Sequence, residues 1–224
     1  MNKNNKPGWK PIEILAHILE VSNWFYHMSY SQFETLEQAL EAFDITPIEA
    51  KFFPDLSPIV PSDLLTTFLK RSVPIVSAAS EKARSEGIIY PILLEVRELL
   101  HESVSLFSGK DFSIDSTVGL NGIVDFLICR SPSILIPTAP AIVLLEAKRG
   151  DIASGYGQCV AEMVAAVRFN ARKNKGELPV YGCVSNGLLW RFLRLEGQTV
   201  TMDLTDYSLA PIGELLAKLV WMVS

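Results

Sequence analysis

Two apolar runs in the middle of the sequence, at 123–129 and 142–147, most constrain how this chain can fold. Each run carries a single acid, Asp125 in the first and Glu146 in the second. The second run is otherwise continuously apolar, which suits a central strand of a sheet that is covered on both faces. Because the side chains of a strand alternate between its faces, Glu146 and Lys148 should point to the same face.

The charged side chains in these runs need compensation. If the two runs pair as neighbouring strands, Asp125 reaches the same spot as Glu146 and Lys148. Two carboxylates and one ammonium group on an otherwise apolar sheet are costly to bury without a compensating ion or partner. A divalent metal ion would supply that compensation, so the sequence predicts a cation site where the two runs meet.

The pattern along the rest of the chain predicts a mixed α/β sheet with helices on its faces. Apolar residues recur at helical spacing in some segments and alternate or run continuously in others. Pro91 is expected to kink the first of these helices or to mark its true start. In chain order, the sequence predicts a helix at 77–101, strands at 103–107, 123–129 and 142–147, a helix at 157–172, strands at 178–184, 188–195 and 199–204 (the last at an edge), and a helix at 210–222.

Residues 1–75 form a predicted helical extension that packs on the main α/β domain, residues 76–224. Apolar residues at helical spacing predict helix within 11–50, and a stretch with several prolines follows. A short helix is expected at 64–70, and Pro74 should separate it from the helix that comes next.

Length and composition bound the class of protein. The chain has 224 residues, of which 49% are hydrophobic, enough for one domain with an extension. It has no apolar run of the roughly 18 residues that a membrane span needs and no segment of signal-peptide type. We therefore expect a cytoplasmic protein without a membrane partner. A net charge of −5 argues against a protein that coats nucleic acid non-specifically. The three cysteines lack disulfide or metal-ligand spacing and should be buried.

The residue types at the predicted cation site suit one kind of chemistry. Mg²⁺ prefers hard oxygen ligands and is usually bound by one or two carboxylates together with substrate phosphate oxygens. The ion lowers the pKa of a bound water and neutralises the charge that builds on the phosphate under attack. A lysine beside it can position or deprotonate that water. Asp125, Glu146 and Lys148 therefore outline a site for phosphodiester hydrolysis.

The run Asp125 … Glu146-Ala-Lys148 … Gln158 resembles the PD-(D/E)XK nuclease superfamily. The resemblance implies that Asp125 and Glu146 hold a metal ion and that the backbone carbonyl of Ala147 faces it. It also implies that Lys148 is the catalytic lysine. Gln158 corresponds to the glutamine often found at the start of the following helix in some branches of the superfamily.

The resemblance covers roughly residues 80–195 and implies a restriction-endonuclease-like fold for the 76–224 domain. The core of that fold is a helix, a three-strand meander, a helix and a further strand, which agrees with the predicted order. Many members carry another glutamate on the leading helix. Here Glu86 is favoured over Glu95, because it lies near the helix start. One departure is Val124, which stands where some members have proline.

The implied activity is that of a metal-dependent nuclease that uses Mg²⁺ or Mn²⁺, with DNA as the favoured nucleic-acid partner. DNA versus RNA, endonuclease versus exonuclease action, and assembly as a homodimer all stay open. The segment from Glu146 to Lys175 holds six basic residues against three acids. Within it Arg168, Arg172 and Lys173 are candidate phosphate contacts. Cations near a helix end are equally expected from the helix dipole.

Other interpretations also stay open. Glu146 and Lys148 could form a surface ion pair at a sheet edge, Asp125 could cap a strand end, and the helix glutamates could be solvated. The chain could be a catalytically inactive binding or scaffold module on the nuclease fold, which the low basicity and the apolar extension favour. A dinucleotide-binding enzyme is a third class, because Gly155-Tyr-Gly157 begins like a dinucleotide loop, although the third glycine of that motif is missing.

Overall fold

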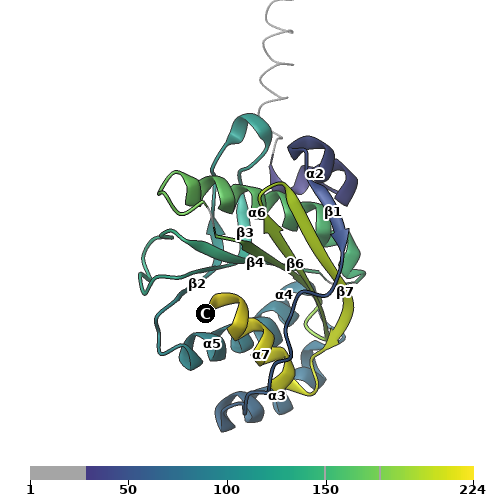
Figure 1. Ribbon diagram of the computed structural model, residues 1–224. Coiled ribbons are helices and arrows are strands. Elements are labelled where there is room, and N and C mark those ends of the chain that lie inside the picture. Colours follow the sequence, from purple (N-terminus) through teal and green to yellow (C-terminus); the bar gives the residue numbers. More distant parts are fainter. Residues whose placement is uncertain (1–28, 149, 177) are drawn as a thin grey trace, which may run out of the picture.

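The computed structural model describes residues 29–148, 150–176 and 178–224 (Figure 1). The side chains of Val143, Leu144 and Glu146 lie outside this description. The elements in chain order are η1 (Tyr30–Gln32), α2 (Leu36–Phe43), β1 (Thr46–Glu49), α3 (Asp63–Val76), α4 (Glu81–Arg84), η2 (Ser85–Ile89), α5 (Tyr90–Leu99), β2 (Ser105–Asp111), η3 (Ser116–Val118), β3 (Ile123–Cys129), β4 (Ala141–Ala147), η4 (Ile152–Gly155), α6 (Tyr156–Ala171), β5 (Val180–Ser185), β6 (Leu189–Glu196), β7 (Thr199–Ser208) and α7 (Ile212–Val223).

Within the described residues, a seven-stranded sheet has the strand order β1-β7-β6-β5-β4-β3-β2. β4 pairs with β5, and β1 with β7, in parallel, whereas the other neighbouring strands are antiparallel. The chain therefore has the predicted α/β class with a mixed sheet. β4 lies between β3 and β5, as its continuous apolar run predicted for a central strand.

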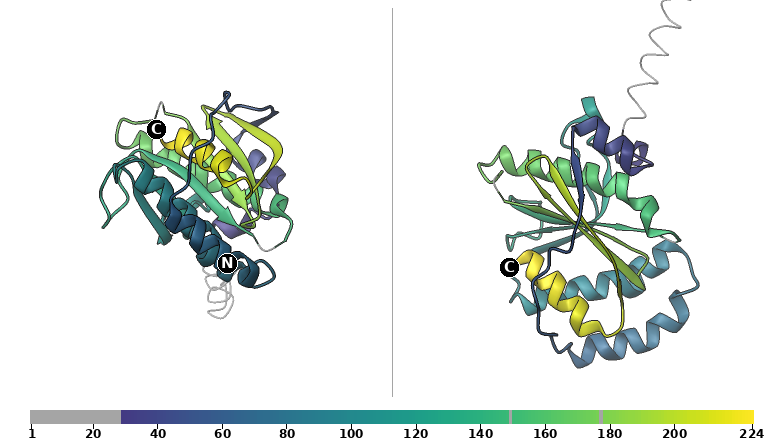
Figure 2. Two further views of the ribbon diagram at one scale, coloured as in Figure 1. Left: turned by 90° about the horizontal axis from the view of Figure 1, so that it is seen from below. Right: turned by 45° about the vertical axis from the view of Figure 1, so that its right-hand side comes forward.

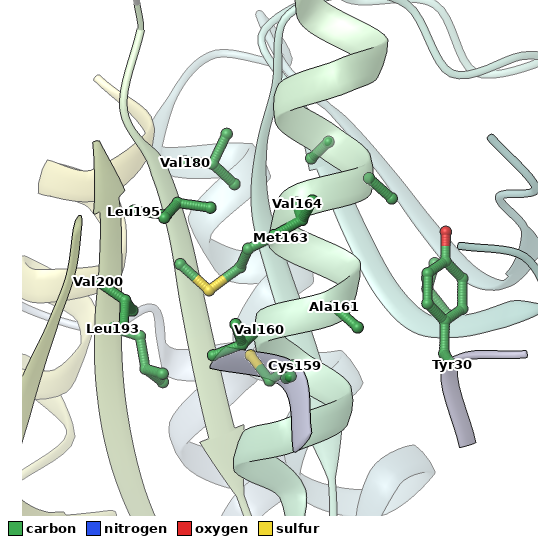
Figure 3. Packing of buried hydrophobic residues seen from close by; sticks show 14 of the residues in the cluster. Tyr30, Cys159, Val160, Ala161, Met163, Val164, Val180, Leu193, Leu195 and Val200 are labelled. Carbon is green, nitrogen blue, oxygen red and sulfur yellow. The ribbon is translucent and has the colours of Figure 1, made fainter. Parts of the chain in front are cut away.

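Helices cover both faces of this sheet (Figures 1 and 2). On one face lies α6, with α2 packed beside it, and their apolar side chains form a core cluster with the sheet. On the other face α3, α5 and α7 form a second cluster. Figure 3 shows the first cluster, in which Cys159, Val160 and Met163 of α6 lie beside Val180 and Leu195 of the sheet.

The described part of the N-terminal extension contains a strand as well as helices. α2 begins at a capping box on Thr35 and ends at Asp44, which has a left-handed backbone conformation. Residues 46–49 then form β1, which pairs with β7. Of the helix predicted within 11–50, the part at 36–43 is confirmed by α2, the part at 46–49 is wrong, and the part at 11–28 lies outside the described residues. β7 is also not the edge strand that was predicted, because β1 covers it.

Prolines affect α3 and α5 in different ways. α3 continues through Pro74 to Val76, so the predicted helix end before this proline is wrong. Pro74 lies in the last turn, where its missing N–H removes a single backbone hydrogen bond. Pro91 lies inside a continuous helical stretch, 81–99, directly after the π-helical turn η2, so the helix does not start at this proline. Because Pro91 cannot donate to the carbonyl of Gly87, four residues earlier, that carbonyl instead accepts from the hydroxyl of Ser72 at 2.7 Å.

Two glycines at the start of α6 let this helix approach its neighbours closely. A Cβ atom on Gly157 would overlap the carbonyl oxygens of Phe33 and Thr35, and a Cβ on Gly155 would lie 2.6 Å from Cγ1 of Val184. The Gly-Tyr-Gly segment also begins within the short helix η4, whose last residue is Gly155, and does not directly follow a strand. Its glycines therefore serve close packing, and the segment lacks the strand–loop–helix context of a dinucleotide site.

Replacing Gly157 with alanine should destabilise the fold, because the added methyl group collides with backbone that cannot move away freely. We expect the free energy of unfolding to fall by about 2 kcal/mol, as for an overpacked core. Urea unfolding followed by circular dichroism measures the change. Gly150→Ala is the control, because a Cβ there meets nothing within 4 Å. Equal stability of the two variants would contradict this packing role.

Candidate active site

Asp125 is tied to the end of the neighbouring strand. The pairing of Phe126 with Leu145 sets the register of β3 and β4, so the next position places Asp125 opposite residue 146. The backbone N–H of Ala147 donates to Oδ2 of Asp125 at 2.8 Å. The two apolar runs are therefore neighbouring strands, and the carboxylate of Asp125 lies where they meet, as the sequence predicted.

Glu146 belongs to β4, and its backbone pairs with Val184 of β5. Its side chain lies outside the described part of the structure. The alternation of the strand still assigns a face to this position. Ala147 belongs to the cluster with α5 and α7, so position 146 lies on the opposite face, toward α6. The start of β3 departs from simple alternation, because Val124 and Leu127 both pack in the α6 cluster, so Asp125 is placed by its pairing and its hydrogen bond to the N–H of Ala147 rather than by a face.

Lys148 follows β4 directly and is held by the start of α6. Its backbone N–H donates to the carbonyl of Ser185 at 2.8 Å, which continues the β4–β5 pairing. A Cβ on Gly155 would lie 3.1 Å from Cε and 3.2 Å from Cγ of Lys148, so the lysine stem packs against this glycine. A bulkier residue at 155 would displace the lysine. As far as their described atoms show, Asp125, Glu146 and Lys148 therefore lie at the same end of the sheet.

Burial raises the pKa of Asp125 above its usual range. The N–H of Ala147 and the charge of Lys148 oppose this rise in pKa, whereas the charge of Glu81 adds to it. The charges of Lys148 and Glu81 therefore both act on the carboxylate of Asp125. A half-buried carboxylate that is only partly compensated is suited to bind a cation, because the cation stabilises its ionised form.

The glutamates of the leading helix occupy different places. Glu86, predicted as an outer ligand, is 69% exposed, and its carboxylate lies 3.8 Å from Nζ of Lys82 on the same helical face. Glu95, the other candidate, is buried and accepts hydrogen bonds from the backbone N–H and the hydroxyl of Ser62 at 2.6 and 2.7 Å. It therefore fastens the start of α3. Glu81 is the helix glutamate whose charge acts on Asp125.

Sequence reasoning passed over Glu81, although a local signal marks its position. Ser80 is the N-cap of α4, and its hydroxyl accepts from the N–H of Ala83 at 3.2 Å. Glu81 is therefore the first residue of the helical segment, which is the place that the resemblance assigns to the helix glutamate. The predicted helix, 77–101, began before Glu81, and only Glu86 and Glu95 were weighed as candidates.

Gln158 lies in the first turn of α6, three residues after the glycine that contacts Lys148. Its Nε2 donates to Oε1 of Glu162 at 3.1 Å. Glu162 is fully buried, and its charge helps to raise the pKa of Tyr30, after the larger effect of burial. The structure thus brings Gln158 to the same end of the sheet and orients it through a buried acid.

The predicted phosphate contacts lie elsewhere. Arg168 and Arg172 are 10 and 14 residues after Gln158, which corresponds to about 15 and 21 Å along the helix. Nη1 of Arg168 lies 2.8 Å from Oδ2 of Asp115. Nη2 of Arg172 donates to the carbonyl of Ile114 at 3.1 Å. These arginines fasten the 114–115 loop to the far end of α6, where Lys173 is also exposed. They are not brought together with Asp125.

Comparisons with known proteins leave the function to be argued from the structure. No protein-family model matches the chain, and no curated protein matches it. Within the described residues no cluster of three histidine, cysteine or acidic side chains is placed to hold a metal ion. That search does not extend to the side chain of Glu146. None of the helices in the described ranges is long and apolar enough to cross a membrane.

The raised pKa of Asp125 predicts how pH affects stability. In the folded protein this carboxyl binds its proton more tightly, so its contribution to stability is present below the unfolded pKa and is lost as the pH rises through the folded pKa. We therefore expect metal-free Asp125→Asn to match the wild type in acid and to become more stable at neutral pH, by on the order of 1 kcal/mol.

Urea unfolding in EDTA at a series of pH values measures this difference. Asp55→Asn is the control, because Asp55 is exposed and its substitution should give no such trend. If Asp125→Asn is less stable than the wild type at neutral pH, the carboxylate is a stabilising structural group, and this electrostatic interpretation is wrong.

Proposed function

We propose that this chain is a metal-dependent nuclease that hydrolyses phosphodiester bonds, with DNA as its favoured substrate. The observation that carries the proposal is the hydrogen bond from the N–H of Ala147 to the half-buried carboxylate of Asp125. This bond joins β3 and β4, the strands that carry Asp125 and Glu146, at the residue directly before Lys148. A half-buried acid, a second acid opposite it in the strand register and a lysine at one sheet end are the groups that this reaction needs.

The order of elements supports the finer assignment to the restriction-endonuclease-like fold. α5 is followed by the antiparallel meander β2-β3-β4, then by α6, and then by β5 in parallel with β4. This is the order that the resemblance implies. β6, β7 and β1 extend the sheet beyond it.

Asp125 and Glu146 would hold the metal ion, together with the backbone carbonyl of Ala147. Mg²⁺ and Mn²⁺ suit this set, because both take hard oxygen ligands. When bound, such an ion makes an attacking water more acidic and offsets the charge that builds on the phosphate. Glu81, through its charge on Asp125, is a better candidate for an outer contact than Glu86.

The remaining residues would position the reactants. The side-chain stem of Lys148 packs against Gly155, and its backbone N–H is held by the carbonyl of Ser185. In the proposed reaction the lysine orients the nucleophilic water and stabilises negative charge. Gln158, held by Glu162, would contact Lys148 or the substrate backbone.

Variants at the site test the proposal. Glu146→Gln and Lys148→Ala should each lower cleavage of plasmid, linear and single-stranded DNA at least about 100-fold, because each loses a group that acts on the reacting phosphate. Gel assays with Mg²⁺ or Mn²⁺ measure the rates. Glu98→Gln and Lys70→Ala, at exposed helical positions, are the matched controls. Activity of the site variants equal to that of the controls would refute the assignment.

A non-catalytic module on the same fold is the second candidate. The net charge of −5 and the engagement of Arg168 by Asp115 favour it, because both reduce the positive surface available to a nucleic acid. Calorimetry with Mn²⁺ separates the two candidates. The nuclease should bind Mn²⁺ in a manner that Asp125→Asn abolishes, whereas an inactive module should show no binding that depends on Asp125.

A further inference from the structure

Arg191 of β6 lies on the same face of the sheet as position 146 and in the same row as position 146 and Asp125. Residue 146 of β4 pairs with Val184 of β5, and Val184 pairs with Arg191. Residues that are directly opposite on neighbouring strands share a face. Leu193 and Leu195, at alternate positions of β6, pack in the α6 cluster, which confirms this face for Arg191.

The spacing of the strands fixes how far Arg191 lies from the predicted metal site. Neighbouring strands are about 4.8 Å apart, so Arg191 is about 10 Å from position 146 and about 14 Å from Asp125 along the row. It is too remote to bind the reacting phosphate. A nucleic-acid strand that occupies the site extends over such distances, because its backbone carries phosphates on both sides of the scissile bond.

The guanidinium group of Arg191 is held in one orientation. Nε donates to Oδ1 of Asp206 at 2.6 Å, and Nη1 donates to the hydroxyl of Tyr156 at 3.1 Å. Tyr156 is buried and is the first residue of α6, the helix whose start also contacts Lys148. Among the described residues, Nη2 makes no hydrogen bond, and the side chain is 24% exposed. The Nη2 side of the guanidinium group therefore remains available to bind a ligand.

This arrangement suits an anion better than it suits a role in stability alone. An exposed ion pair such as Arg191–Asp206 contributes little to folding. A guanidinium group that is oriented by a carboxylate and a tyrosine has less freedom to lose when it binds, and its planar fork matches the oxygens of a phosphate. The nearby N-terminus of α6 adds a partial positive charge.

We propose that Arg191 is a phosphate-binding residue for a nucleic-acid strand in the candidate active site, with Asp206 and Tyr156 as its positioning residues. This inference rests on the proposed function. It assigns Arg191 the phosphate-contacting role that Arg168 and Arg172, at the far end of α6, are poorly placed to fill. The contact is with a backbone phosphate away from the scissile bond, so it carries no base specificity.

Binding of a fluorescein-labelled DNA duplex, followed by anisotropy between 50 and 200 mM salt with Ca²⁺ in place of Mg²⁺, tests the inference. Arg191→Gln should weaken binding about tenfold and reduce the salt slope by about one, as for the loss of one phosphate contact. Arg191→Lys should keep part of the affinity, because it retains the charge but not the fork. Thermal unfolding confirms that each variant is folded.

Arg194→Gln is the matched control. Arg194 is also on β6 and in an ion pair, with Glu196 at 2.8 Å, but it lies on the opposite face of the sheet and should leave DNA binding unchanged. If the wild type binds DNA and Arg191→Gln binds equally well, the inference is overturned while the nuclease proposal stands. If the wild type binds neither DNA nor an RNA strand of equal length, both are overturned.

Discussion

The site depends on one half-buried carboxylate. Asp125 accepts the N–H of Ala147, and through this bond the end of β3 is fixed to the end of β4. Burial raises the pKa of Asp125, and the nearby charges of Lys148 and Glu81 act on it in opposite directions. A fold optimised for stability alone would place an apolar side chain there. Retention of the acid at this point is the physical reason to interpret the sheet end as a cation site.

The surrounding packing keeps the chemical groups near this carboxylate. Gly155 and Gly157 let the first turn of α6 lie against β5 and against the backbone after η1. That approach restrains Lys148 on one side and places Tyr156, with its hydrogen bond from Arg191, on the other. The placement of the candidate metal ligands, of Lys148 and of Arg191 thus depends on how α6 begins.

Local signals in the sequence were sufficient for much of this fold. β3 spans the predicted 123–129, β4 begins one residue before its predicted range, and α6 lies one residue earlier than predicted at both ends. Asp125 was placed correctly beside the end of β4, because strand alternation and pairing of two apolar runs determine its position. The lysine followed from its place directly after the second run.

Features that depend on distant contacts were not predictable in this way. β1 was taken for helix because its partner β7 lies at the other end of the chain. The helix through Pro74 depends on packing against η2 and α5 rather than on local propensity. Arg191 could not be recognised from its own segment. Its position relative to the candidate site depends on the register of β4, β5 and β6, and its orientation depends on partners in α6 and β7.

A crystal grown with Mn²⁺ and measured for anomalous scattering tests the central claim most directly. The account predicts a peak within coordinating distance of the Asp125 and Glu146 carboxylates, and a peak elsewhere, or none at saturating Mn²⁺, would contradict it.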